Sequence, residues 1–400
     1  MKENFKWGKR NTVIKLAGLF SHPIQYFVPL FKELASRPEI NLTIYYCSRQ
    51  GLEPSFDHMF GQSFKWDIPL LEGYHYVFLP NLRRRISVKG FFSLINPSII
   101  RELNKGRYDA ILVHGYEHAT KWIAFLASTL SGIKIMFHGE SHLEAPRSNL
   151  TIKLKEILLR PLFRGFDVFL YIGERNREYY KYYGVKYSQL FFTPYTVDNS
   201  FFRRAKDKIV EKRNEIRKSF GILDNNPVIL FIGKLYNVKQ PILLLDAFYR
   251  VRKEFPCHLL IVGDGELRSD IEAEICNRGI PDVKITGFLN QTKIPEAYVA
   301  GDVFVLPSSK ERWGITVNEA MNYSLPIVVS DRVGCAPDLV KQDINGYIVQ
   351  HDSVHALANA IEKLVLNDNL RKSFGERSLE IIENWNIKLT ADGIIEALNF

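Results

Sequence analysis

The chain has 400 residues, of which 46% are hydrophobic and 24% are charged, and its formal net charge is +9. This length favours two domains, and the ordinary composition excludes a low-complexity or solenoid-repeat protein. A basic chain favours anionic partners, and phosphorylated substrates or a membrane surface fit better than nucleic acid, because the sequence has no helix-turn-helix, zinc-finger or RNA-binding signature.

Short apolar runs alternate with helical patterns through the first half of the chain. This alternation is typical of β-helix-β units, which build a parallel sheet with helices on both faces. We expect helices at residues 24–36 and 119–130. The expected strands are residues 12–20, 41–47, 108–113, 133–137, 167–172 and 190–193.

A second series of the same kind follows a highly charged segment at residues 203–218, which we expect to be helical or linking. The pattern predicts two doubly wound α/β domains joined around residues 195–215, with ligands beyond the carboxyl ends of the strands. The strands expected in the second domain are residues 227–232, 258–262, 283–286, 303–306 and 327–330.

Two glutamates with seven residues between them, Glu311 and Glu319, are the most informative feature of the second series. A helix is expected to open near Ile315, so that Glu311 lies just before it and Glu319 about one turn inside. A helix N-terminus favours phosphate, and ionised carboxylates accept hydrogen bonds from sugar hydroxyls. The pattern therefore predicts a pocket for a phosphate linked to sugars, and the alternative is a surface helix with two solvated carboxylates.

A pair of lysines, Lys234 and Lys239, follows Gly233 at the end of the expected strand 227–232. A diphosphate carries about two negative charges, and lysine ammonium groups can neutralise them where water is partly excluded. The alternative interpretation is two solvated lysines in a turn. Neighbouring strands are followed by glycine turns at residues 263–265 and 287–288, which alone are weak signals.

The segment after Glu311 continues with Glu319-Ala320-Met321 and then with the run Leu325 to Ser330. In this order the segment resembles the retaining glycosyltransferases of family 4, which have the GT-B fold, two Rossmann-like domains facing a cleft. The resemblance implies the following domains: an acceptor domain at residues 1–200, a donor domain at residues 201–384 and a C-terminal helix at about 385–400 that crosses back to the first domain.

The resemblance also implies a nucleotide-diphosphate sugar as donor substrate and no cofactor. Lys234 and Lys239 would bind the donor diphosphate and stabilise the leaving group, Glu311 would contact the donor sugar, and His138 would lie beside it. Glu319 would accept bonds from the ribose hydroxyls. The remaining predicted donor-binding residues are Gly233, Gly287, Phe288, Trp313, Gly314, Ile315 and Thr316.

Polar residues that follow strands of the first half are candidates for the acceptor side. Relatives often have a glycine pair in the first strand-to-helix turn, and this chain has serine and histidine there instead. A lone histidine is more often structural than catalytic. The acceptor or first-loop candidates are Ser21, His22, His114, Glu117 and Glu140.

The expected reaction is the retaining transfer of a hexosyl or N-acetylhexosaminyl group to a glycan or lipid-linked acceptor in cell-surface polysaccharide synthesis. The sequence has no Asp-x-Asp pair, and cationic side chains with a helix end can replace a metal, so we predict metal-independent transfer. Two alternatives stay open: a phosphorylase or epimerase on the same fold, and a non-catalytic scaffold that binds sugar nucleotides or glycans.

The four cysteines are not spaced like a zinc site or a redox pair, and neither a membrane-spanning run nor a signal peptide is visible. We therefore expect a cytoplasmic location. Residues 82–92 and 152–166 mix cations with large apolar side chains, which suits peripheral contact with an anionic membrane at its inner face. The alternative for each segment is an apolar face in the core with cations in water.

Overall fold

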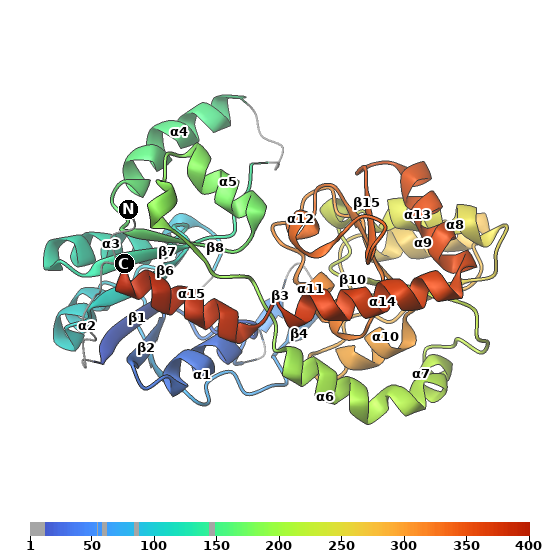
Figure 1. Cartoon of the computed structure of the whole chain (residues 1–400), viewed down its shortest axis with the longest axis horizontal. Coiled ribbons are helices and arrows are strands. Elements are labelled where there is room, and N and C mark those ends of the chain that lie inside the picture. The colour runs from blue at the N-terminus through green and yellow to red at the C-terminus, as the bar shows by residue number, and fades with distance from the viewer. Residues whose placement is uncertain (1–12, 54, 58–61, 84–87, 144–148) are drawn as a thin grey trace, which may run out of the picture.

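The computed structural model describes residues 13–53, 55–57, 62–83, 88–143 and 149–400. Two parallel sheets lie side by side, each with helices packed on it, and a two-stranded hairpin lies near the junction between them (Figure 1). We call the part built on the first sheet the first domain and the part built on the second sheet the second domain. The prediction of two parallel-sheet α/β domains is confirmed.

The first sheet has seven parallel strands in the order β5-β2-β1-β6-β7-β8-β9. Helices cover both of its faces: α1 and α15 pack on one face, and α2 to α5 pack on the other. Its strands are β1 (Ile14–Phe20), β2 (Ile40–Tyr46), β5 (His75–Phe78), β6 (Ala110–His114), β7 (Lys134–His138), β8 (Val168–Tyr171) and β9 (Leu190–Phe192). Its helices are α1 (Val28–Ser36), α2 (Ser98–Gly106), α3 (Ala119–Ser131), α4 (Asn149–Phe163), α5 (Glu174–Tyr182) and α15 (Ile387–Asn399).

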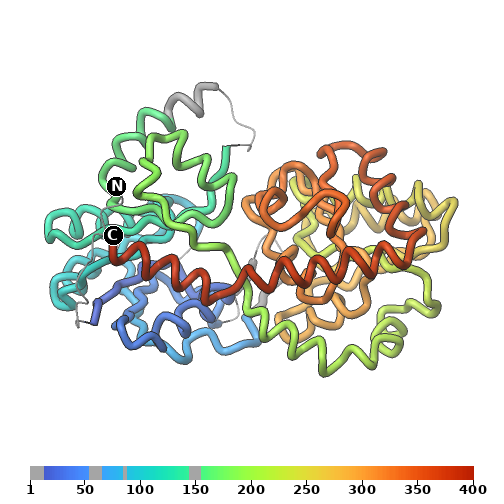
Figure 2. Tube along the Cα trace, in the orientation of Figure 1, coloured from blue at the N-terminus to red at the C-terminus, as the bar shows by residue number. Residues whose placement is uncertain are grey.

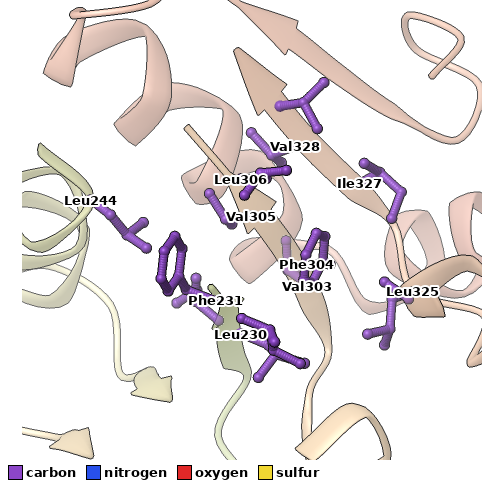
Figure 3. Close-up of a cluster of buried hydrophobic side chains, with 14 of the residues drawn as sticks. Leu230, Phe231, Leu244, Val303, Phe304, Val305, Leu306, Leu325, Ile327 and Val328 are labelled. Atoms are coloured by element: carbon purple, nitrogen blue, oxygen red, sulfur yellow. The ribbon is translucent and has the colours of Figure 1, made fainter. Parts of the chain in front are cut away.

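The second sheet has six parallel strands in the order β12-β11-β10-β13-β14-β15. Its central strands are buried on both faces, which is why they read as continuous apolar runs in the sequence (Figure 3). The strands are β10 (Val228–Ile232), β11 (His258–Val262), β12 (Val283–Ile285), β13 (Val303–Leu306), β14 (Ile327–Ser330) and β15 (Gly346–Val349). The helices are α8 (Pro241–Arg252), α9 (Arg268–Arg278), α10 (Ile294–Ala300), α11 (Ile315–Asn322), α12 (Ala336–Leu339), α13 (Val354–Leu366) and α14 (Asp368–Glu383).

Two stretches of chain connect the domains. The charged segment expected to be helical or linking forms most of α6 (Asn199–Ile209) and α7 (Arg213–Ser219), which lie along the second domain. Further on, α14 packs on the second domain, and α15 continues onto the first sheet (Figure 2). Trp385 lies between these two helices and donates its indole N–H to the carbonyl oxygen of Tyr195 at 3.0 Å. The two stretches of chain that connect the domains therefore lie against each other.

Several boundaries differ from the expected ones. Helix α1 begins at Val28 rather than at residue 24, because residues 25–27 form a turn and Pro29 occupies the first turn of the helix, where proline needs no N–H partner. The short strands β5 and β15 were not expected from the sequence. The hairpin of β3 (Ser55–Asp57) and β4 (Gln62–Phe64) was not expected either.

The structure describes the two segments that mix cations with apolar residues to different extents. Residues 84–87, in the first segment, lie outside the described residues. In the second segment, Leu159, Leu162 and Phe163 of α4 are buried on the first sheet, whereas Ile157 and Leu158 are 70% and 65% exposed. None of the helices in the described ranges has the length and hydropathy needed to cross a bilayer. Contact with a membrane surface stays a prediction.

Candidate active site

A cavity of about 260 Å³ lies between the two domains, at the carboxyl ends of β10 and β11 and at the first turn of α11. This is the edge at which doubly wound sheets bind ligands. Nine of the predicted site residues line it: Gly233, Lys234, Lys239, Phe288, Glu311, Gly314, Ile315, Thr316 and Glu319. They come from the loops after β10, β12 and β13 and from the start of α11, which the parallel topology of the second sheet brings together.

Lys239 and Glu311 form an ion pair in the wall of this cavity. Their side chains are only 17% and 16% exposed, so the pair is largely shielded from water. The main chain of Glu311 is held on both sides, because its N–H donates to the Arg332 carbonyl at 3.3 Å and its carbonyl accepts from the Gly334 N–H at 3.1 Å. His142 of the first domain also donates to the Glu311 carbonyl, at 3.0 Å. The backbone of Glu311 is thus held from both domains, and its carboxylate is held by Lys239.

The first turn of α11 borders the same cavity. Gly314 caps this helix with φ of 96°, a left-handed conformation in which a residue with a side chain is strained. Ile315 and Thr316 follow it along the cavity wall. The unpaired N–H groups of a helix start favour an anion, and the ammonium groups of Lys234 and Lys239 add positive charge on the same wall. The arrangement can therefore bind a phosphorylated ligand.

Close backbone packing explains the glycine turn that follows β11. The N–H of Gly263 donates to the Gly287 carbonyl at 2.9 Å, and a Cβ on Gly263 would lie 1.9 Å from the Gly233 carbonyl oxygen. No other residue fits there without moving the chain. Gly263 lines the cavity, whereas Gly287, predicted to bind the donor, is not among the lining residues and supports the wall from behind.

Glu319 reaches the cavity from inside α11 and is 2% exposed. Tyr298 of α10 donates its hydroxyl to Glu319 Oε2 at 2.5 Å, and Tyr26 and Gln291 also hydrogen-bond the carboxylate. Burial raises the pKa of Glu319 to about 7, and these three hydrogen bonds limit the rise. The side chain therefore changes charge close to neutral pH.

The first domain supplies two aromatic residues to the cavity, Tyr26 and Trp66. Tyr26 lies in the turn before α1, and its bond to Glu319 crosses the domain junction. Trp66 follows the hairpin β3–β4. No role is predicted for either residue from the sequence, because only the packing of the two domains brings them to the second sheet.

The side chain of Trp313 points away from the cavity. Its side chain is 4% exposed and is not among those that line the cavity. The indole N–H donates to Asn318 Oδ1 at 2.8 Å, and the ring lies 5.9 Å from the ring of Trp385 and 6.3 Å from that of Tyr195. The Trp313 side chain therefore packs against the two segments that connect the domains, and the role of this residue in donor binding stays a prediction.

His138 lies close to the cavity but behind Tyr26. Tyr26 lines both the main cavity and a small cavity of about 20 Å³ that His138 also lines. The His138 ring is 5.2 Å from the ring of His114, whose Nε2 is 3.4 Å from Glu140 Oε1. Burial lowers the pKa of His138 to about 3, which keeps this imidazole neutral at physiological pH. Burial alone would raise the pKa of Glu140, but His114 lowers it to about 2.

The other first-domain candidates form contacts outside the cavity lining. Glu117 binds the Lys121 ammonium at 2.5 Å, and the Lys121 side chain is only 1% exposed. Ser21 Oγ lies 2.9 Å from His22 Nδ1, and burial, with help from the charges of His114 and Lys121, lowers the pKa of His22 to about 4. Within the described ranges, no group of three or more histidine, cysteine, aspartate or glutamate side chains is placed to hold a metal ion.

A family model matches the part of the chain that forms most of the second domain. Residues 212–380 match the family model of glycosyl transferases group 1. The chain is 32% identical over 169 residues to an alpha-D-kanosaminyltransferase of Streptomyces kanamyceticus, a match that covers 42% of this chain and 43% of that protein. The chain therefore spans less than half the length of that relative.

A longer match exists to the UDP-Gal:alpha-D-GlcNAc-diphosphoundecaprenol alpha-1,3-galactosyltransferase of Escherichia coli, with 26% identity over 326 residues, or 79% of this chain and 81% of that protein. Among solved structures, a glycosyltransferase from Rickettsia africae ESF-5 aligns with a TM-score of 0.75 and 15% identity over 97% of this chain and 98% of that one.

Anabaena Alr3699/HepE in complex with UDP and glucose aligns with a TM-score of 0.72 and 16% identity over 96% of this chain and 99% of that one. Structural likeness at these identities concerns the fold, and it extends over both domains. The GT-B fold expected from the sequence is confirmed.

Proposed function

We propose that this chain, whose residues 212–380 belong to the glycosyl transferases group 1 family, transfers a sugar from a nucleotide-diphosphate sugar to an acceptor hydroxyl with retention of configuration. One observation carries the proposal. The Lys239–Glu311 ion pair, the Lys234 side chain and the N-terminus of α11 line one cavity that faces the first domain. Positive groups for a diphosphate and a carboxylate for a sugar are therefore adjacent.

The cavity suggests a role for each group in the reaction. Lys234, Lys239 and the first N–H groups of α11 bind the diphosphate and stabilise the negative charge that grows on it as the bond to the sugar breaks. Glu311 accepts hydrogen bonds from the sugar hydroxyls and orients the sugar. The acceptor hydroxyl approaches from the side of the leaving phosphate, which takes its proton, and the closed junction between the domains limits attack by water.

The first domain is the proposed acceptor side. The polar edge at His114, His138 and Glu140 adjoins the cavity across Tyr26, so an acceptor bound there would meet the donor sugar. The name of the Escherichia coli relative describes an acceptor linked to a lipid diphosphate. A glycan or lipid-linked acceptor in cell-surface polysaccharide synthesis is accordingly the class we propose, and the transferred group is a hexosyl or N-acetylhexosaminyl group.

A thermal-shift screen with sugar nucleotides tests the proposal. A true donor binds the folded chain and raises its midpoint of unfolding as its concentration increases. The nucleoside diphosphate alone should also stabilise the chain, because it fills the same cavity. Product analysis with the stabilising sugar nucleotide then distinguishes transfer to an acceptor from phosphorolysis or epimerisation. If no sugar nucleotide or nucleoside diphosphate shifts the midpoint, the proposal fails.

Transfer is expected to continue in the presence of a metal chelator. Two lysines and a helix N-terminus already supply positive charge where the diphosphate would bind, so a divalent cation is not needed to neutralise it. The measurement is the initial rate of nucleoside diphosphate release with and without excess EDTA. A complete loss of activity that magnesium restores would contradict metal-independent transfer.

A further inference from the structure

A short segment of the first domain reaches over the edge of the cavity in the second domain. We call residues 65–67 the strap. The carbonyl of Lys65 accepts a hydrogen bond from Asn290 Nδ2 at 2.7 Å. On the other side, Asp67 accepts bonds from the main-chain N–H of Thr292, at 3.2 Å to Oδ2, and from its hydroxyl. The strap is therefore attached at both ends to the loop after β12.

Trp66 is the middle residue of the strap and lines the cavity. Its main-chain N–H donates to the Gly51 carbonyl at 3.3 Å, and its ring lies beside Gly51, where an added Cβ would be 3.2 Å from Trp66 Cδ1. Trp66 is thus anchored to the first domain, while the residues on either side of it bind the second. This double attachment holds the indole in the wall of the cavity.

The cavity has a polar part and an apolar part. The polar part contains Lys234, Lys239 and Glu311 with the first turn of α11. The apolar part contains Phe288 and Leu289, which precede the two residues that the strap binds, and Ile294, which follows them. Trp66 belongs to this second part, because its neighbours Lys65 and Asp67 bind residues 290 and 292.

A nucleoside diphosphate has the same division, with charge at one end and a flat aromatic base at the other. When the diphosphate lies at the lysines and the ribose at Glu319, the base extends toward the apolar part. We propose that Trp66 stacks on the base of the bound nucleotide, so that the first domain supplies one wall of the base-binding site. This inference rests on the proposed function and adds a specificity-determining residue from the opposite domain.

Binding measurements on Trp66 variants test the inference. The probes are uridine, thymidine, adenosine and guanosine diphosphates and inorganic pyrophosphate, measured by calorimetry on the whole chain. Stacking of a base on an aromatic side chain typically changes affinity by roughly 5- to 150-fold. Trp66→Ala should weaken the binding of the preferred nucleoside diphosphate by about tenfold or more. The affinity for pyrophosphate should stay within about twofold of the wild-type value.

Two further variants distinguish stacking from simple apolar contact. Trp66→Phe keeps an aromatic face and should retain most of the affinity, whereas Trp66→Leu should resemble Trp66→Ala. Trp122→Phe is the matched control, because that indole binds the Tyr116 carbonyl and lies outside the cavity lining. In wild type and in Trp122→Phe, the nucleotide should quench tryptophan fluorescence, and this quenching should largely disappear in Trp66→Phe.

Several results would overturn the inference. Unchanged nucleotide affinity in Trp66→Ala, or wild-type affinity in Trp66→Leu, would show that the ring does not stack on the base. If Trp66→Ala weakened the binding of pyrophosphate as much as that of the nucleoside diphosphate, Trp66 would act on the diphosphate and not on the base. In each of these cases the proposed function still stands if Lys239→Ala weakens pyrophosphate. If wild type binds none of the nucleoside diphosphates, the proposed function fails together with the inference.

Discussion

Replacing Lys239 by alanine is expected to lower the rate of sugar transfer by about 10²- to 10³-fold, the usual cost of losing one group that stabilises charge in a transition state. The Lys239 ammonium lies in the cavity wall against Glu311, and both side chains are shielded from water, so its charge acts at short range through little solvent. The chain should stay folded. The measurement is kcat with the sugar nucleotide that gives the largest thermal shift, together with the affinity for inorganic pyrophosphate.

A double-mutant cycle separates two possible roles of this lysine. If Lys239 only holds Glu311 in place, adding Lys239→Ala to Glu311→Gln should not reduce the affinity for pyrophosphate any further. If it binds the diphosphate, the second substitution should still reduce pyrophosphate affinity. Lys253→Ala is the matched control. This lysine directly follows α8, lies over the Tyr249 ring and is outside the cavity lining. Wild-type turnover in Lys239→Ala would contradict the assignment of the diphosphate to this wall.

Replacing Glu319 by glutamine should change how the stability of the chain depends on pH. The pKa of Glu319 is about 7 in the folded chain, against 4.5 as its ordinary value, so the folded state holds a proton that the unfolded state releases. Stability from this group is therefore greatest below about pH 4.5 and is lost as the pH rises toward 7. From pH 5 to pH 8.5 the free energy of unfolding of the wild type should fall by about 2–3 kcal/mol relative to that of Glu319→Gln.

Chemical denaturation of both chains over this pH range measures the effect. Tyr298→Phe provides a second test, because Tyr298 donates a hydrogen bond that lowers the pKa of Glu319. Without this bond the pKa should rise further, and the loss of stability should extend to higher pH. Parallel curves for wild type and Glu319→Gln at every pH would show that the carboxylate keeps its ordinary pKa in the folded chain.

The second domain could be predicted from the sequence to a large extent. Its strands are buried on both faces, so each appears as a short apolar run, and polar residues follow where the strand ends. Because all six strands are parallel, the residues after β10 and β13 meet at one edge, which brings Lys239 to Glu311 although 71 residues separate them in the sequence. The start of α11 at Ile315 was predicted because Gly314 marks it.

The contribution of the first domain could not be predicted in the same way. Tyr26 and Trp66 reach the cavity only because the two domains pack against each other, and no local pattern encodes that packing. A motif also does not fix the direction of a side chain. Trp313 belongs to the glutamate segment, but its ring turns toward Trp385, and His138 ends a correctly predicted strand but lies behind Tyr26.

The crossing of α15 onto the first sheet has a consequence for how the chain is made. Ala391, Ile394 and Ala397 complete an apolar cluster around Phe20 and Phe31 of the first domain. Translation of the residues between β9 and α15, 193–386, takes about 10–40 s at roughly 5–20 residues per second. During this interval only α1 covers that face of the nascent first sheet, so the apolar cluster of the first domain cannot be completed until α15 has been made.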